Sequence, residues 1–532
     1  MGVMALMAEM AKAPSRRPVC LGAYSRHEVR PSRPRVVTGR VRWLGAGGAL
    51  LLALSAQGAN WNTSAGLQVS ETWSDNIALA AAGSERHEMV TDVSPSVHLS
   101  STGGRLGLNL DASCHGLQYA NGTSAKHSDT TLNSTGKLEV IDKWLFVDGI
   151  ASISQQNTSP FAGQNTSLAN IDSNRSTVRN FSLTPNIQGM LGADLSYSLR
   201  YLNSQTSTDS TLASNSRGRT FSGGLKWGNS SRLFNFGADF SSASTAYANQ
   251  ADTTTRSVRA TAYLNADAHL NFSAFVSRES NNYSLTGQSG VAKGINMHWT
   301  VSERTSLDLA REYHVYGPTA QVSFSHRMPR SAFQLSYSRS SNTTSTQGIT
   351  TGFSPTYNTF LQQCLPFLPV EQCSPLAVQL LGTSAFAQLP FISNTSYIQR
   401  SLQGSLVLTG VRNTVSLTAS RSDSRNDSAI AAASDILASS SLILQRSFSL
   451  NWAFKLTPFS NLTSSVSRSR NSSPGVAASD TTYTALNLLW STQLTQKLLG
   501  SLSLRHTLNA VTAGTVLPYR EHAAIATLGY TY

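Results

Sequence analysis

Apolar and polar residues alternate with a period of two along most of the chain from Trp61 onward. In residues 191–201, LGADLSYSLRY, the leucines and tyrosines fall on one face, while Asp194, Ser196 and Arg200 fall on the other. Residues 234–240 and 270–276 repeat this pattern. Such alternation is typical of β-strands with one apolar and one polar face. The sequence therefore predicts an all-β protein.

The predicted strands are joined alternately by short turns and by longer connections rich in Ser, Thr, Asn and Gly. The longest of these connections is 343–395. The short turns are predicted at Ser101–Gly104, Asp142–Lys143, Gly189–Met190, Gly228–Ser230, Asn265–Asp267, Ser302–Arg304, Pro329–Arg330, Val411–Arg412, Pro458–Asn461 and Thr495–Gln496. Short turns at one end and long loops at the other are typical of bacterial outer-membrane barrels.

The number of strands is consistent with a closed barrel. Ten hairpins around the short turns, with 61–72 at the start and 519–532 at the end, give 22 strands, within an expected range of about 18–24. An open sheet of this length would expose two unpaired edges, which a bilayer does not tolerate. We expect a closed antiparallel transmembrane β-barrel with short periplasmic turns and long extracellular loops. A soluble β-helix or propeller is less favoured, because no fixed repeat period is visible.

The first 59 residues have the features of an export signal. An Arg-rich stretch precedes Trp43–Ala56, which contains no charged residue and is too short for a comfortable membrane-spanning helix. Small residues at Ala56, Gly58 and Ala59 suit cleavage there. We expect 1–59 to be a signal peptide, with a membrane anchor as the alternative, and 60–532 to be the barrel.

Charge excludes one class of partner and the C-terminus indicates another. Residues 1–59 hold nine Lys or Arg and two Asp or Glu, so they carry +7 of the net charge of +13. The rest of the chain is nearly balanced, which gives no support to nucleic-acid binding. The final strand ends on Tyr530 and Tyr532, which we expect to act as the C-terminal signal for the barrel-insertion machinery. The expected location is the bacterial outer membrane, with its lipid as a partner.

No motif in the sequence indicates an enzyme or a cofactor. Nucleophile-elbow, zinc-protease, Walker and dinucleotide-binding motifs are all absent. One cluster of acids and a histidine occurs on the predicted inner side of a strand, where His314 lies near Asp308 and Glu312. Some outer-membrane barrels are proteases or lipases, so this cluster leaves a hydrolase as an alternative. We expect a protein that is not an enzyme and binds no metal or cofactor.

Alternation also predicts which charged residues face the lumen. Both signs occur among them, so neither strong anion nor strong cation selectivity is expected. The predicted lumen-facing charges are Asp92, Arg105, Asp111, Lys137, Glu139, Asp148, Asp194, Arg200, Lys226, Asp239, Arg259, Asp308, Glu312 and Arg327. Neutral hydroxyl and amide groups dominate the rest of this face, which could suit a hydrated neutral solute or a saccharide, or could be a generic wet lining.

The longest connection contains an apolar insertion. Residues 362–389 are rich in Leu and Pro and include Cys364 and Cys373, which could form a local disulfide in an oxidising compartment. Long loops of this kind tend to be functional. We expect the insertion to fold into the barrel mouth as a constriction, because apolar surface is costly to leave in water; binding an external partner is the alternative.

Two stretches are similar to a known family. ETWSDNIALA, Glu71–Ala80, and DKWLFVDGIASISQQNTSPF, Asp142–Phe161, together with the signal peptide and the terminal aromatic strand, resemble the proteobacterial outer-membrane β-barrels associated with the PEP-CTERM/exosortase system. This resemblance implies a channel or scaffold in exopolysaccharide export or assembly, with polysaccharide and other proteins of that system as partners. It carries over no catalytic or binding residues. A general porin for small hydrophilic solutes is the alternative.

Overall fold

A computed structural model describes residues 60–164, 167–210, 214–228, 232–342, 393–430, 435–475 and 478–532. The predicted signal peptide, both cysteines of the possible disulfide and the apolar insertion at 362–389 lie outside these residues. Among the residues that the structure describes, no helix is long and apolar enough to cross a membrane.

The described residues form 22 strands and one short helix, α6 (Ile436–Ser440). The strands are β1 (Asn60–Ser74), β2 (Glu88–Thr102), β3 (Leu106–Tyr119), β4 (His127–Ile141), β5 (Leu145–Asn157), β6 (Arg175–Leu191), β7 (Leu195–Thr208), β8 (Ser216–Trp227), β9 (Phe234–Tyr247), β10 (Thr253–Asn265), β11 (Leu270–Asn281), β12 (Ser289–Ser302), β13 (Thr305–His314), β14 (Gly317–Met328), β15 (Ser331–Asn342), β16 (Tyr397–Thr409), β17 (Asn413–Asn426), β18 (Leu442–Lys455), β19 (Ser460–Ser473), β20 (Ser479–Gln493), β21 (Leu498–Ala513) and β22 (Tyr519–Thr531).

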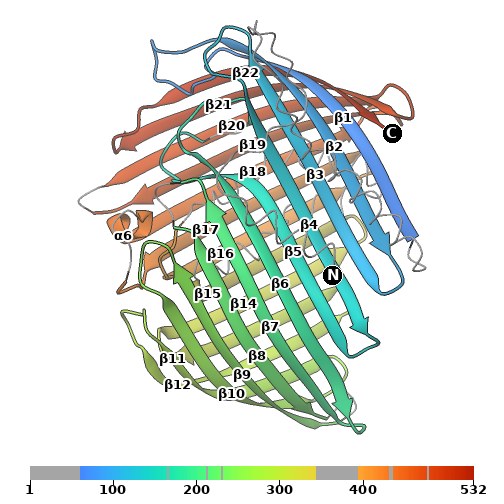
Figure 1. Cartoon of the computed structure of the whole chain (residues 1–532), viewed down its shortest axis with the longest axis vertical. Helices are drawn as coiled ribbons and strands as arrows, with labels where there is room; N and C mark the ends of the chain where they lie inside the picture. The colour runs from blue at the N-terminus through green and yellow to red at the C-terminus, as the bar shows by residue number, and fades with distance from the viewer. Residues whose placement is uncertain are drawn as a thin grey trace, which may run out of the picture.

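These strands make one closed antiparallel barrel. Each strand pairs with the next in sequence, and β1 pairs with β22 from Gly66↔Thr531 to Ser74↔Ala523. Figure 1 shows the strands wrapping around a single axis, with α6 beside the end that carries the longer connections. We call this end the loop end and the other the turn end. The predicted closed barrel and its count of 22 strands are confirmed.

Alternation sorts the side chains into an outward apolar face and an inward polar face. On β1, Val69 is 39% exposed, whereas the adjacent Ser70 is 7% exposed. The register extends this division from strand to strand around the barrel, and the large exposed hydrophobic residues of the strands fall in the outward rows, apart from Met190 at the turn end of β6. The outward rows also hold aromatic residues near the turn end, including Trp227, Trp299 and Trp490. An apolar outer belt with an aromatic girdle identifies an outer-membrane type of barrel.

One predicted turn is wrong in position. The sequence places a turn at Gly189–Met190, but β6 continues to Leu191, and the chain reverses around Gly192. Gly192 has φ +69, a left-handed conformation that other residues rarely adopt, whereas Gly189 is extended within the strand. Two glycines lie close together here, and the pattern alone does not show which of them takes the turn conformation.

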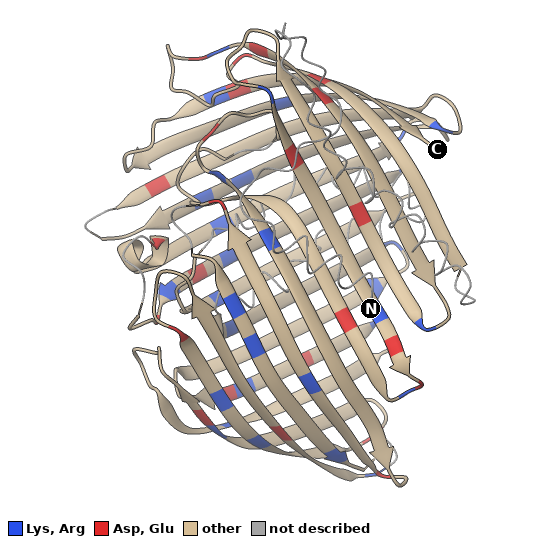
Figure 2. Ribbon diagram, in the orientation of Figure 1, with Lys and Arg blue, Asp and Glu red and all other residues tan. Residues whose placement is uncertain are grey.

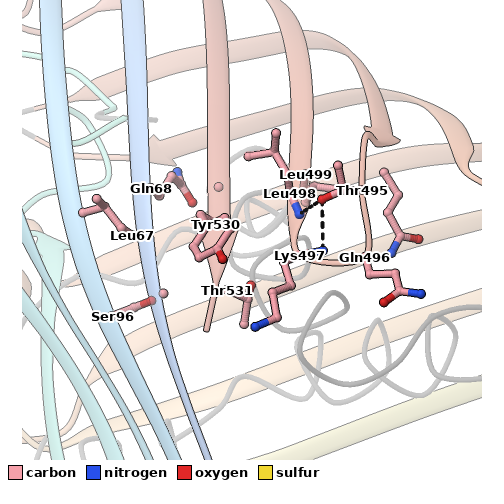
Figure 3. Close-up of a pocket in the computed structure, with 13 residues that line it drawn as sticks. Leu67, Gln68, Ser96, Thr495, Gln496, Lys497, Leu498, Leu499, Tyr530 and Thr531 are labelled. Atoms are coloured by element: carbon pink, nitrogen blue, oxygen red, sulfur yellow. Dashed lines mark hydrogen bonds between the residues drawn. The ribbon is translucent and has the colours of Figure 1, made fainter.

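The barrel closes where the last strand meets the first. Tyr530 lies opposite Leu67, and the Tyr532 backbone N–H donates to the Ala65 carbonyl at 2.8 Å. Figure 3 shows Tyr530 between β1 and the β20–β21 turn, in which Thr495 Oγ1 accepts from the Leu498 N–H at 3.1 Å. The C-terminal strand is therefore the closing strand. Recognition of Tyr530 and Tyr532 by insertion machinery stays a prediction.

Candidate functional site

The inner surface of the barrel differs between two sectors. On β2 to β14 the inward rows contain carboxylates, histidines and basic residues. On β15 to β19 the inward rows hold Ser, Thr, Asn and Gln and contain one charged residue among those described, Lys455 at the turn end of β18. We call the neutral sector the hydroxyl wall. Its polar members are Gln334, Ser336, Ser338, Ser340, Asn342, Gln399, Ser401, Gln403, Ser405, Thr409, Thr414, Ser416, Thr418, Ser420, Ser422, Ser424, Asn426, Gln445, Ser447, Ser449, Asn451, Asn461, Thr463, Ser465, Ser467, Ser469, Asn471 and Ser473.

The predicted lumen charges lie in the other sector, and two of them lie in turns. Arg105 follows β2 in the β2–β3 turn, and Asp194 ends the β6–β7 turn, where it forms an ion pair with Arg232 at 2.5 Å. The other twelve occupy inward rows of their strands. These are Asp92, Asp111, Lys137, Glu139, Asp148, Arg200, Lys226, Asp239, Arg259, Asp308, Glu312 and Arg327.

Several of these inward charges contact neighbours across the strands. Asp92 pairs with His115 at 2.9 Å, and Asp111 pairs with His98 at 2.6 Å. The bases contact rings instead. Lys137 lies over the Phe146 ring, Lys226 over the Tyr263 ring and Arg259 over the Phe275 ring. Both signs of charge occur in this sector, and carboxylates outnumber Lys and Arg.

The acid–histidine cluster differs from its predicted composition. His314 Nδ1 lies 3.0 Å from Glu279 of β11, and its Nε2 lies 2.7 Å from Glu312. Asp308 is not part of this group, because it pairs with His298 of β12 at 2.5 Å. A catalytic histidine keeps one ring nitrogen for the nucleophile and the other for its carboxylate. Both nitrogens of His314 contact carboxylates, so the geometry favours a structural role.

One other group has the order of hydroxyl, histidine and carboxylate: Ser113 Oγ lies 3.2 Å from His115 Nε2, and His115 Nδ1 lies 2.9 Å from Asp92. Groups of three or more His, Cys, Asp or Glu suited to a metal ion are absent from the part of the chain that the structure describes.

A connection crosses the loop end of the barrel. Residues 158–174 join β5 to β6, and Phe161 packs against Tyr397 of β16, Leu437 of α6 and Ile443 of β18. In a ring of 22 strands, β16 lies 11 strands from β5, half-way around. The segment therefore spans the mouth and contacts the opposite wall.

Hydrogen bonds hold this crossing segment at several points. Asn471 Nδ2 of β19 donates to the Pro160 carbonyl at 2.9 Å, and the Gln164 N–H donates to Tyr519 Oη at 3.0 Å. Asn170 Nδ2 donates to Glu521 at 2.8 Å. All three bonds are buried, and they come from strands β19 and β22, well separated from β5 and β6 in the ring.

Other connections join the same cap. The Asp427 carboxylate, after β17, accepts from Ser284 Oγ at 2.8 Å and from Thr286 Oγ1 at 3.1 Å, both in the β11–β12 connection. Asp435 accepts from Ser393 Oγ at 2.9 Å, and Asn394 Nδ2 donates to the Ser214 carbonyl. We call the described parts of 158–174, 282–288, 393–396, 427–430 and 435–441 the mouth cap. It links connections from both sides of the barrel.

Asp172 is a buried carboxyl group in the mouth cap. Burial raises the pKa of its carboxyl above the ordinary value, and the Oδ2 atom is shielded with no hydrogen-bond donor among the described residues. A buried carboxylate is costly when ionised. The closed cap is therefore favoured below the ordinary Asp pKa, and that contribution is lost as pH rises through the raised pKa.

We expect the ion current through the channel to increase as pH rises through this range. Asp172→Asn is expected to reduce the dependence and to give a smaller current at neutral pH, since the amide stays neutral. Planar-bilayer recordings across the acidic range test this. Asp209→Asn, in the exposed β7–β8 connection, is the matched control. An unchanged pH profile in Asp172→Asn would count against the assignment.

Sequence reasoning missed the crossing segment. The sequence predicts the constriction at residues 362–389, which lie outside the described residues, and predicts 156–175 only as one of the longer polar connections. A signal was present, since Phe161, Leu168 and Ile171 are apolar residues in an otherwise polar connection. The two stretches that carry the family resemblance also converge here. Ile77 from the first packs with Ala169, and Phe161 ends the second.

Comparison with known proteins gives likenesses of shape alone. No family model matches the chain, and no curated protein matches it. Among solved structures, the siderophore receptor PirA from Pseudomonas aeruginosa is 10% identical with a TM-score of 0.44, covering 88% of this chain and 80% of that one. The FrpB iron transporter from Neisseria meningitidis is 8% identical with a TM-score of 0.48, covering 88% and 81%. OccK1 (OpdK) from Pseudomonas aeruginosa is 8% identical with a TM-score of 0.37, covering 88% and 99%, and nothing about substrate follows at this level of identity.

Proposed function

We propose that the protein is an outer-membrane channel for a neutral, hydrophilic saccharide chain, acting in exopolysaccharide export or assembly. The observation that carries the proposal is the hydroxyl wall, which lines five adjacent strands with neutral donors and acceptors. Hydroxyl and amide groups exchange many weak hydrogen bonds with a saccharide without holding it. A channel selective for ions would be expected to carry a dominant charge in place of this wall.

The mouth cap supports a gated channel over a permanently open porin. Hydrogen bonds from opposite sides of the barrel hold the cap across the loop end, so passage of a polymer requires the cap to move. The resemblance of Glu71–Ala80 and Asp142–Phe161 to barrels of the PEP-CTERM/exosortase system supports an exopolysaccharide as the polymer. A general porin remains the second candidate. The contacts of His115 with Ser113 and Asp92 keep a hydrolase as the third candidate.

Saccharide binding inside the channel is expected to depend on the hydroxyl wall. In planar bilayers, neutral oligosaccharides should interrupt the ion current of the wild-type protein. The triple variant Gln334→Ala, Gln403→Ala and Thr418→Ala removes inward polar groups of β15, β16 and β17. Each hydrogen bond contributes about 0.5–1.5 kcal/mol, so the loss of three should raise the concentration for half-block at least about tenfold.

The matched control removes three polar side chains from the outward face of β19 and β20: Ser464→Ala, Ser472→Ala and Thr484→Ala. Neutral oligosaccharides should block this control channel at the same concentration as the wild-type channel. Equal block in both triple variants would contradict a saccharide-binding wall. Deletion of the gene separates export from a general porin, because export predicts loss of surface polysaccharide, and unchanged polysaccharide with reduced solute uptake favours the porin.

A further inference from the structure

The outward face of the barrel has an asymmetric distribution of charge. Within the described strands, every outward Lys, Arg, Asp or Glu lies in the half nearer the loop end. The outward bases are Arg175, Arg179, Arg217, Arg219, Arg256, Arg278, Lys293, Arg311, Arg339, Arg400, Arg421, Arg425, Arg446, Arg468, Arg470 and Arg520. Figure 2 shows blue segments close to α6, on the loop side of the barrel. The function proposed above does not involve this face.

Arginines are most concentrated on five neighbouring strands. Seven of them form what we call the arginine patch: Arg339 on β15, Arg400 on β16, Arg421 and Arg425 on β17, Arg446 on β18, and Arg468 and Arg470 on β19. All but Arg339 are exposed. The patch therefore presents a dense positive surface toward the lipid side of the barrel.

Within the patch, like charges lie directly opposite one another. Arg339 is the cross-strand partner of Arg400, and Arg446 lies between Arg421 on one side and Arg470 on the other. Like charges at opposite positions destabilise a sheet. With neighbouring strands about 4.8 Å apart, the row of three guanidinium groups spans about 10 Å. Such a row is unfavourable unless anions neutralise all three of its charges.

The described residues do not supply enough anions. Asp423 pairs with Arg421 at 3.1 Å and Asp480 pairs with Arg470 at 2.5 Å, which leaves Arg339, Arg400, Arg425, Arg446 and Arg468 without an ion pair in the described part of the chain. The Nε and Nη1 atoms of Arg339 are shielded and have no acceptor there. A ligand with several anionic oxygens would satisfy these groups.

The residues beside the patch indicate what else the ligand carries. Moving toward the turn end, the outward rows change at once to Leu402, Phe448 and Val466. The patch therefore marks the border of the apolar belt, where the headgroups of the outer leaflet lie. A ligand there meets arginines with its head and apolar side chains with its tail.

We propose that the arginine patch binds the phosphate groups of a phosphorylated lipid in the outer leaflet. Guanidinium groups hold phosphate oxygens in bidentate pairs, for which Arg is better suited than Lys. A row of three arginines suits two phosphates of one headgroup, and the acyl chains lie along Phe448 and its apolar neighbours. The bound lipid offsets the repulsion between the opposed arginines and fixes the barrel relative to the outer leaflet.

The test counts lipid bound to the purified full-length protein. Detergent-solubilised protein is mixed with a diglucosamine lipid carrying two phosphates, and bound lipid is measured by native mass spectrometry. The patch variant is Arg339→Gln, Arg400→Gln and Arg446→Gln. The control variant is Arg256→Gln, Arg278→Gln and Arg311→Gln, three outward loop-end arginines that each lie opposite uncharged residues. Both variants remove three positive charges from outward positions near the loop end.

Wild-type and control proteins are expected to bind the lipid alike, and the patch variant about tenfold more weakly or worse, since charge-assisted hydrogen bonds are lost. Equal loss in both variants would indicate general electrostatics and overturn the proposal. Equal binding of the same lipid without phosphates would also overturn it, as would full competition by inorganic phosphate at the lipid's own concentration. A triple Arg→Lys variant at the patch positions keeps the charge and is expected to bind at an intermediate level.

Discussion

Replacing residues 160–172 with a short Gly-Ser linker is expected to raise the single-channel conductance several-fold. This segment crosses the mouth from β5–β6 to β16 and β18, and it carries the buried contacts of Phe161, Gln164 and Asn170. Without it, the loop end loses the span that narrows the lumen. Planar-bilayer recordings of the purified variant measure the change directly. Brief closures of the channel should also become less frequent, because the replaced segment can no longer close the mouth.

A single substitution perturbs the same crossing segment without changing the chain length. Gly163→Ala would place a methyl group in contact with the Asp172 carboxylate, which would have to shift. We expect a single-channel conductance between those of the wild type and the linker variant, with more frequent openings. The matched control replaces 514–518, the β21–β22 connection, with a linker of the same composition, and its conductance should equal that of the wild type. If the shortened 158–174 connection conducted no better than this control, the crossing segment would not be the constriction.

The sequence predicted the barrel because each strand carries its own evidence. Alternation over residues 191–201 or 234–240 is local, and so is the turn chemistry that separates strands, so the count of 22 is confirmed. The predicted turn at Gly189–Met190 is wrong because Gly189 and Gly192 lie close together, and only Gly192 adopts the left-handed conformation. The exact end of a strand depends on which single residue takes the turn conformation, whereas the number of strands does not.

The functional features that sequence reasoning missed depend on register and on long-range contacts. Asp308 shares a strand with His314, yet its partner is His298 across the sheet. Arg446 acquires like-charged neighbours only when β17, β18 and β19 align. The contact between Phe161 and Tyr397 joins opposite sides of the ring. None of these relations is visible within a single strand.

The mouth cap and the hydroxyl wall together suggest how passage could be controlled. The wall lies on β15 to β19, and the far end of the crossing segment contacts β16, β18 and β19. The cap therefore closes over the same sector that is proposed to guide a saccharide. A polymer that occupies the wall would compete with the cap for Asn471, whose side-chain amide donates to the Pro160 carbonyl. Coupling between substrate and gate follows from this shared position.

Loss of the Glu521 carboxylate is expected to destabilise the barrel strongly. Arg505 and Glu521 form a buried ion pair at 3.1 Å, with side chains 2% and 0% exposed. Glu521 also accepts from Ser74 Oγ at 2.8 Å and from Asn170 Nδ2 at 2.8 Å, so it joins β1, β21, β22 and the cap. Glu521→Ala leaves the Arg505 charge buried without its partner. Removing one member of such a pair costs about 3–5 kcal/mol.

Unfolding by denaturant in detergent micelles measures this loss, and two comparisons identify its cause. Arg179→Ala breaks the exposed pair with Asp209 at 2.8 Å and should change the free energy of unfolding by less than about 1 kcal/mol. The double variant Arg505→Met with Glu521→Leu removes both charges and should recover much of the stability lost in Glu521→Ala, because an apolar pair needs no counter-ion. It should still loosen the cap, since Asn170 loses its acceptor, so conductance should rise even where stability is restored. A double variant as unstable as Glu521→Ala would instead show that the hydrogen bonds to Ser74 and Asn170, and not the uncompensated arginine, dominate the effect.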